Sequence, residues 1–113
     1  MFLNSLKWNF YKKRLRDIKL VILDVDGVLT NGKINYSSKG EQSKEFDVKD
    51  GLGIKMLQKV GIEVCLISGG EAGASQFRAE KLNINNYFFD VKDKLSNINS
   101  IQKKLKISKK ETL

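Results

Sequence analysis

The chain has 113 residues, 41% of them hydrophobic, which fits one folded domain and excludes an intrinsically disordered chain. Its single cysteine, Cys65, excludes an intramolecular disulfide and a cysteine-cluster zinc site. The sequence shows no signal-peptide pattern and no apolar run of membrane-spanning length, so we expect a cytoplasmic protein without a membrane partner. The net charge of +8 comes from lysines spread along the chain rather than from a recognised nucleic-acid-binding motif, so we expect no nucleic-acid partner.

The first third of the chain combines a basic, aromatic opening with one strand and two turns. Residues 1–17 predict an N-terminal helix or extension. Residues 20–23, LVIL, form a continuous apolar run that is typical of a strand buried on both faces. Asn31-Gly32 predicts a hairpin over residues 28–36, and residues 37–40 predict a second turn before a polar strand that runs through Phe46.

The rest of the chain alternates between helical and strand patterns. Two more strands are predicted over residues 62–67 and 87–91, and helices are predicted before Gly61, over residues 71–82 and over residues 93–105. The apolar side chains expected to define the helix faces are Leu52, Met56, Leu57 and Val60, then Phe77 and Leu82, then Leu95, Ile98, Ile101 or Gln102, and Leu105. This alternation predicts a Rossmann-like α/β fold with parallel strands. A capping-box pattern from Ser108 to Glu111 predicts the start of a further helix.

Two aspartates, Asp24 and Asp26, follow the first predicted strand. Residues two apart in an extended segment point the same way, so both carboxylates can face one site. A cation relieves their repulsion, and Mg²⁺, which takes oxygen ligands, fits such a pair. One carboxylate can then act as a nucleophile and the other as a general acid. The spacing also leaves open a plain Asp-Gly turn or two solvated acids, whereas the residues that follow do not match a calcium loop.

Polar residues also follow the other two strands. Ser68, Gly69 and Gly70 offer a hydroxyl and backbone N–H groups to a phosphate, and Lys94 offers a positive charge. A helix-capping serine and a surface lysine are the alternative interpretations. Because the carboxyl ends of parallel strands meet at one edge of a sheet, we expect these residues near Asp24. The sequence has no histidine, which excludes a Ser-His or Cys-His nucleophile but not phosphoryl transfer.

The segments DVDGVLTNG, GEQSKEFDVKDGLGIKML, GIEVCLISGG and DVKDK, together with Arg78, resemble the haloacid dehalogenase superfamily. More narrowly, they resemble the family of 3-deoxy-D-manno-octulosonate 8-phosphate phosphatases. The resemblance covers residues 18–113 as one phosphatase domain and implies a parallel sheet flanked by helices, a small hairpin flap over residues 28–36 and no large cap domain. It also implies a Mg²⁺-dependent hydrolase of a sugar-acid phosphate in lipopolysaccharide precursor synthesis, assembled as a homotetramer.

The same resemblance implies roles for single residues. Asp24 resembles the nucleophile that forms an aspartyl-phosphate, Asp26 resembles the acid and base, and both are implied to bind Mg²⁺. Ser68, Gly69 and Lys94 are implied to hold the phosphate. The residues implied to contact the sugar acid are Asp26, Asp47, Val48, Lys49, Asp50, Gly51, Lys55 and Arg78.

The chain departs from the family pattern in two respects. Many relatives carry arginine where this chain has Gly70 and Lys55, which changes how a substrate carboxylate is recognised. The family's fourth motif, an acidic pair that completes the Mg²⁺ site, is expected after the helix that Ser108 begins, where only Thr112 and Leu113 remain. One alternative is therefore a truncated, non-catalytic homologue or fragment that binds sugar phosphate or assembles with full-length subunits. A second is a phosphatase for a nine-carbon, sialic-acid-type ulosonate phosphate, and a third is a basic nucleic-acid binder.

Overall fold

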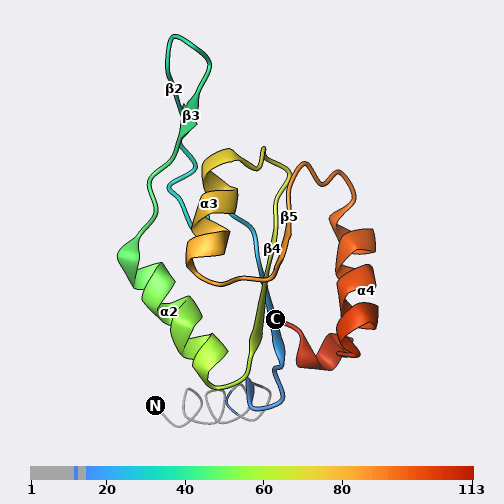
Figure 1. Cartoon of the computed structure of the whole chain (residues 1–113). Helices are drawn as coiled ribbons and strands as arrows, with labels where there is room; N and C mark the ends of the chain where they lie inside the picture. Colours follow the sequence, from blue (N-terminus) through green and yellow to red (C-terminus); the bar gives the residue numbers. More distant parts are fainter. Residues whose placement is uncertain (1–11, 13–14) are drawn as a thin grey trace, which may run out of the picture.

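A three-stranded parallel sheet forms the centre of the computed structural model, which describes Lys12 and residues 15–113 (Figure 1). The strand order is β1 (Leu20–Leu23), β4 (Glu63–Ile67) and β5 (Asn86–Phe88), with β4 in the middle. The predicted parallel sheet is confirmed, although β5 is shorter than predicted because the chain turns at Asp90, which has a φ of 54°. The helix predicted over residues 1–17 falls largely outside the described residues.

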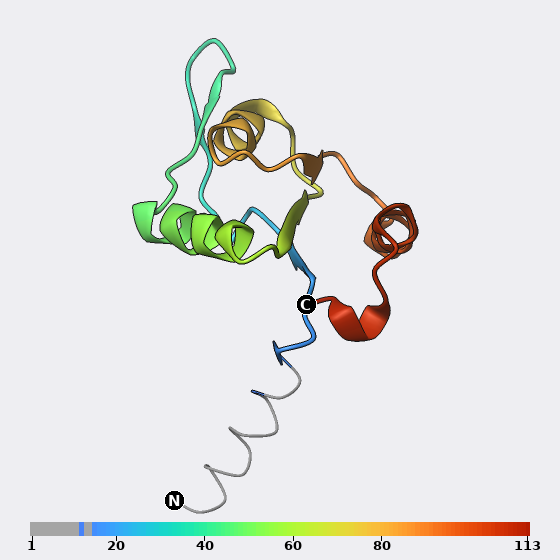
Figure 2. The same ribbon diagram turned by 60° about the horizontal axis from the view of Figure 1, so that its bottom comes forward.

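Helices cover both faces of this sheet. Figures 1 and 2 show α2 (Val48–Lys59) and α3 (Gly73–Lys81) on one face and α4 (Lys94–Leu105) on the other. The arrangement confirms the predicted α/β class with flanking helices. Among the described residues, no helix has the length and apolar character needed to cross a membrane.

The residues of β4 alternate between two hydrophobic cores. Val64 and Leu66 pack with residues of α2 and α3, whereas Cys65 and Ile67 pack with residues of α4. Side chains two apart in a strand share a face, so a strand apolar throughout supplies both cores. Burial raises the pKa of the Cys65 thiol to about 12, which makes it a packing residue rather than a nucleophile.

Helix ends follow from capping residues. The Asp47 carboxylate accepts the N–H of Lys49 at the start of α2, and Gly61, with a φ of 86°, follows its end. The Asp93 carboxylate accepts the N–H of Ser96 at the start of α4, and these hydrogen bonds with Ser96 lower the pKa of Asp93. Capping therefore positions the first turn of both helices, where predicted substrate-binding and phosphate-binding residues lie.

The predicted helix faces are wrong at several positions. Phe77 is 71% exposed and Leu95 is 66% exposed, and Leu52, Met56 and Val60 are exposed as well. In α3 the buried residues are Ser75 and Ala79, one turn apart, because small side chains allow the helix to approach the sheet closely. Phe77 lies between them in sequence and therefore points away from the sheet.

The predicted hairpin over residues 28–36 is also wrong. The N–H groups of Val28, Leu29 and Thr30 all donate to the C=O of Val25, so this segment forms a tight helical turn instead of a strand. The paired strands are β2 (Asn35–Tyr36) and β3 (Gln42–Ser43), joined by the predicted turn at residues 37–40. This hairpin projects from the carboxyl end of the sheet (Figure 1).

The last residues run along the free edge of β1. The capping box at Ser108 is present, but it begins a single 3-10 turn, η1 (Lys109–Glu111), rather than a longer helix. The N–H of Leu113 donates to the C=O of Leu20 at 2.8 Å, and the N–H of Ile22 donates to the C=O of Leu113 at 2.7 Å. This segment therefore adds a parallel pairing to β1 on the side opposite β4.

Candidate active site

The two aspartates lie on a loop that begins where β1 ends. The Asp24 carboxylate accepts the N–H of Val25 at 2.7 Å through Oδ1 and the ammonium of Lys94 at 2.9 Å through Oδ2. The Thr30 hydroxyl oxygen accepts the N–H groups of Gly27 and Gly32, whose φ angles are 80° and 83°. The loop is thus held by its own hydrogen bonds, and the left-handed glycines permit its path.

A second loop, from Ser68 to Gly70, lies against the first. Ser68 is buried, and its hydroxyl accepts the N–H of Gly70 at 3.1 Å. The N–H of Asp90 donates to the C=O of Gly70, and the N–H of Val91 donates to the C=O of Ser68, so the loop is tied to the one that follows β5. Helix α3 begins only at Gly73, which rules out Ser68 as its capping residue.

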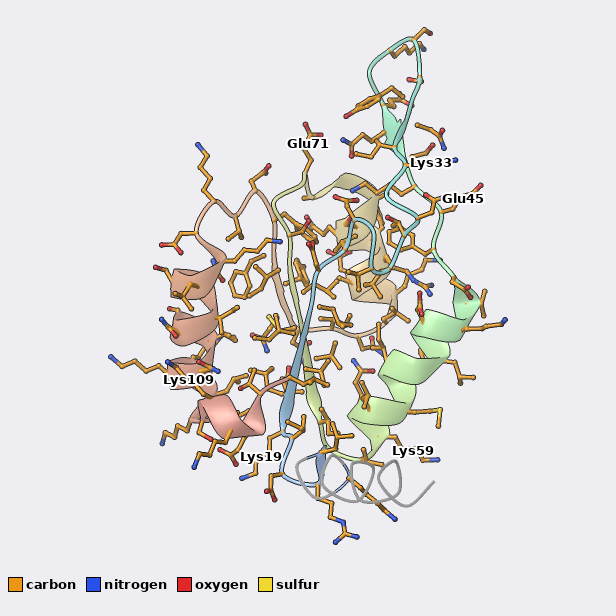
Figure 3. All side chains as sticks on the ribbon, turned by 180° about the vertical axis from the view of Figure 1, so that it is seen from behind. Lys19, Lys33, Glu45, Lys59, Glu71 and Lys109 are labelled. Carbon is orange, nitrogen blue, oxygen red and sulfur yellow. The ribbon has the colours of Figure 1, made fainter. Side chains whose placement is uncertain are left out.

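The three strand ends therefore meet at one edge of the sheet. Lys94, at the start of α4, crosses to Asp24, and a Cβ at Gly70 would lie 2.7 Å from Oδ2 of Asp26. Figure 3 shows Lys33, Glu45 and Glu71 at this end of the molecule, with Lys19, Lys59 and Lys109 toward the opposite end. The structure brings Asp24, Asp26, Ser68, Gly69 and Lys94 together as expected for strand ends, and their chemical roles stay predictions.

One residue of this cluster was missed from the sequence. The ammonium of Lys44, directly after β3, donates to Oδ1 of Asp26 at 2.8 Å, and the Lys44 side chain is 1% exposed. A second contact joins the ammonium to the Ser75 hydroxyl at 3.4 Å. Nothing in the local pattern marks this lysine among the others, because its partner lies 18 residues earlier in the chain.

The chemistry of these donors fits Mg²⁺. Mg²⁺ is commonly held by one or two carboxylates, with water and substrate phosphate oxygens completing its octahedron. Asp24 and Asp26 supply two carboxylates on one loop, next to a buried hydroxyl and a lysine suited to a phosphate. Within the part of the chain that the structure describes, no cluster of three or more histidine, cysteine or acidic side chains could hold a metal ion.

A groove of about 820 Å³ lies between the turn after β1 and the start of α2. Four of the predicted substrate residues line it: Asp47, Val48, Lys49 and Asp50. Gly51 lies beneath Arg78 instead, since a Cβ there would be 2.5 Å from a guanidinium nitrogen. Lys55 is exposed further along α2 and is not among the lining residues.

Arg78 contacts the segment that forms one wall of the groove. Its guanidinium donates to the C=O of Asp47 at 3.2 Å and lies 5.7 Å from the centre of the Phe46 ring. Both contacts are to the segment that leads into α2, so the arginine braces the groove wall through a hydrogen bond and a cation–π contact. The predicted direct contact of Arg78 with a sugar acid stays a prediction.

Comparisons with known proteins point in one direction. A scan against protein-family models found no match. The chain is 38% identical over 101 residues to 3-deoxy-D-manno-octulosonate 8-phosphate phosphatase KdsC of Haemophilus influenzae, which covers 89% of this chain and 56% of the relative. It is 37% identical over 95 residues to the protein of the same name from Escherichia coli K12, covering 84% of this chain and 50% of the relative. The chain thus spans about half the length of these curated relatives.

Solved structures agree with the sequence comparison. A haloacid dehalogenase superfamily structure, subfamily III A, from Legionella pneumophila matches with a TM-score of 0.95 at 31% identity, over 99% of this chain and 62% of the other. The 3-deoxy-D-manno-octulosonate 8-phosphate phosphatase of Moraxella catarrhalis, solved with magnesium, phosphate and the sugar acid, matches with a TM-score of 0.85 at 36% identity, over 88% of this chain and 57% of the other.

Proposed function

The chain belongs to the haloacid dehalogenase superfamily, and within it to the family of 3-deoxy-D-manno-octulosonate 8-phosphate phosphatases, and from this we propose that it is a phosphatase acting on a sugar-acid phosphate. The observation that carries the proposal is the cluster of Asp24, Asp26, Ser68 and Lys94 at the carboxyl edge of the sheet. The proposed substrate is 3-deoxy-D-manno-octulosonate 8-phosphate, which is supported by the names of the relatives.

In the proposed reaction, an Asp24 carboxylate oxygen attacks phosphorus and the bond from phosphorus to the sugar oxygen breaks. Asp26 gives a proton to the leaving sugar oxygen, which yields the free sugar acid and an aspartyl-phosphate on Asp24. Asp26 then takes a proton from water, whose oxygen attacks phosphorus and releases phosphate and Asp24. The proposal is supported by the position of both carboxylates on one loop, where Lys94 contacts Asp24 and Lys44 contacts Asp26.

The phosphate-binding part of the proposal involves Ser68, Gly69 and Lys94. The buried Ser68 hydroxyl and the loop N–H groups can donate to phosphate oxygens, and the Lys94 ammonium adds charge at the same edge. Mg²⁺, held by the Asp24 carboxylate and the backbone carbonyl of Asp26, would offset the negative charge of the phosphate. Lys94 and Mg²⁺ together would lower the repulsion between the Asp24 carboxylate and a phosphate dianion.

The groove is the proposed site for the sugar acid. Lys49 can pair with the substrate carboxylate, and the oxygens of Asp47 and Asp50 can accept hydrogen bonds from hydroxyl groups. A homotetramer in the cytoplasm is part of the same proposal. It is supported by exposed apolar side chains along one face of α2 and at its C-cap, a pattern that fits contact with another subunit: Val48, Leu52, Met56 and Val60.

A second function is favoured by one observation, the lack of a third metal-ligating side chain near Asp24 and Asp26 within the described residues. In this alternative the chain binds a sugar phosphate without hydrolysing it or assembles with full-length subunits. Both functions use the same groove and phosphate loop, so they differ in turnover rather than in binding.

Phosphate release by the 113-residue chain tests the proposal. Eight-carbon and nine-carbon ulosonate phosphates are offered with and without Mg²⁺, beside Asp24→Asn, and binding is measured by calorimetry. We expect Mg²⁺-dependent release from the eight-carbon substrate, loss of turnover in Asp24→Asn and retained substrate binding by that variant. Binding without release supports the non-catalytic alternative, preference for the nine-carbon substrate changes the assigned sugar, and a near-normal kcat in Asp24→Asn sinks the proposed nucleophile.

A further inference from the structure

The buried ammonium of Lys44 has no part in the reaction described above. Its side chain is 1% exposed, whereas the Asp26 side chain that it contacts is 29% exposed. A buried charge is costly unless it is paired and hydrogen-bonded, and the contacts at 2.8 Å with Asp26 and 3.4 Å with Ser75 meet that need. Lys44 is therefore held in place by a carboxylate that the proposed reaction uses.

The Asp26 carboxylate has an ammonium partner on one oxygen and a glycine beside the other. Lys44 holds Oδ1, and Oδ2 lies 2.7 Å from the position that a Cβ on Gly70 would occupy. A Cβ added at residue 70 would require a local shift of this oxygen or of the backbone, since real Cβ atoms do not approach other atoms so closely. Gly70 thus leaves room for the rotamer of Asp26 that the Lys44 ammonium holds.

The lysine also joins three parts of the chain. Lys44 directly follows β3 of the projecting hairpin, Asp26 belongs to the loop after β1, and Ser75 belongs to α3. β3 itself contacts α3, as Figure 1 shows at the base of the hairpin. The ion pair therefore anchors the hairpin beside the reacting groups.

We propose that Lys44 is a positioning residue for Asp26: its ammonium holds the carboxylate, in the space that Gly70 leaves free, in the orientation that the acid–base steps need, and it anchors the hairpin beside the site. The kinetic consequence rests on the proposed phosphatase function. The geometric consequence does not, because the ion pair exists in the resting protein. Lys44 acts through Asp26 and does not itself touch the reacting atoms.

The kinetic test compares Lys44→Met with Lys39→Met, which removes the same charge from the exposed turn of the hairpin. We expect Lys44→Met to lower kcat at least tenfold with KM changed less than threefold, and Lys39→Met to change neither. In an Asp26→Asn background, Lys44→Met should cause no further loss, because the group that it positions is already gone. Equal losses in both backgrounds would overturn the proposal, as they would indicate a structural role alone.

A second readout does not require turnover. In proton–nitrogen NMR, the buried Lys44 ammonium should give a signal protected from exchange with water, unlike the exposed lysines, and this signal should shift or broaden in Asp26→Asn and in Gly70→Ala. If the wild-type chain releases no phosphate but the signal behaves in this way, the proposed function fails and the positioning geometry holds. A Lys44 signal that exchanges like those of exposed lysines, or that ignores Asp26→Asn, overturns the positioning role whatever the activity.

Discussion

Replacing Lys94 by methionine should separate activity from stability. Lys94 occupies the first position of α4, and its ammonium contacts Oδ2 of Asp24 at 2.9 Å. Methionine keeps an unbranched side chain of similar length and a good helix propensity while it removes the charge. The change therefore tests the ammonium and little else.

The structure predicts a small effect on stability. The two side chains are 45% and 39% exposed, so the pair lies close to water. Coulomb's law at this separation with the dielectric of water gives about 1.4 kcal/mol, and ordering two long side chains offsets most of it, leaving about 0–1 kcal/mol. Removing one donor that stabilises developing negative charge in an active site, by contrast, commonly lowers kcat about 100- to 1,000-fold, and we expect a loss of that order for Lys94.

Urea denaturation and phosphate release measure the two effects in the same samples. Lys92→Met is the matched control, because Lys92 is an exposed lysine of the loop that precedes α4. We expect both variants to unfold within about 1 kcal/mol of wild type and only Lys94→Met to lose activity. A kcat within about threefold of wild type in Lys94→Met, or a stability loss above about 3 kcal/mol, would refute the reasoning.

Three further predictions concern stability. Leu66→Ala should lower the unfolding free energy by about 2–5 kcal/mol in urea denaturation, because Leu66 is 1% exposed in the core; a loss below about 1 kcal/mol would contradict the packing. The hydrogen bond from Lys19 lowers the pKa of Glu111 from 4.5 to about 2, so its stabilisation is complete above pH 4.5 and is lost toward pH 2. Glu111→Gln should therefore be less stable than wild type at pH 7, with most of the gap closed at pH 2, and a gap independent of pH would argue against the pair. Gly61→Ala should destabilise the protein by about 1–2 kcal/mol, because the φ of Gly61 is 86°. Gly53→Ala should instead stabilise the protein by up to about 1 kcal/mol, because Gly53 lies inside α2 and nothing lies within 4 Å of the added Cβ. Thermal melting of both variants tests the comparison.

Strands and their ends were predictable because their signals are local. The run LVIL is apolar at every position, which is what a strand between two layers of helices requires, and it forms β1. Asp24, Ser68 and Lys94 each follow a strand or begin the next helix, and parallel strands bring such positions to one edge. The fold class and the meeting of these three side chains at one edge of the sheet therefore followed from order along the chain.

Two local signals led to wrong predictions. Asn31-Gly32 has the sequence of a hairpin turn, but the C=O of Val25 captures the N–H groups of the residues before it, so no strand forms there. Phe77 has the spacing of a core residue, but the small Ser75 and Ala79 face the sheet instead. In both cases a local signal was overruled by a competing contact.

The sequence by itself determined the three parallel strands, the helices that connect them and the polar side chains that follow the strands, because hydrophobic period and chain order act over a few residues. Tertiary structure decided which face of each helix is buried, how the last residues pair with β1 and which lysine reaches Asp26. These outcomes depend on the size and charge of the side chains that lie opposite each surface when the layers pack. Those neighbours come from distant parts of the chain, so they are set only when the segments come together. Lys44 illustrates the point: an ordinary lysine of a polar segment becomes a buried partner of Asp26 only when the hairpin docks against α3.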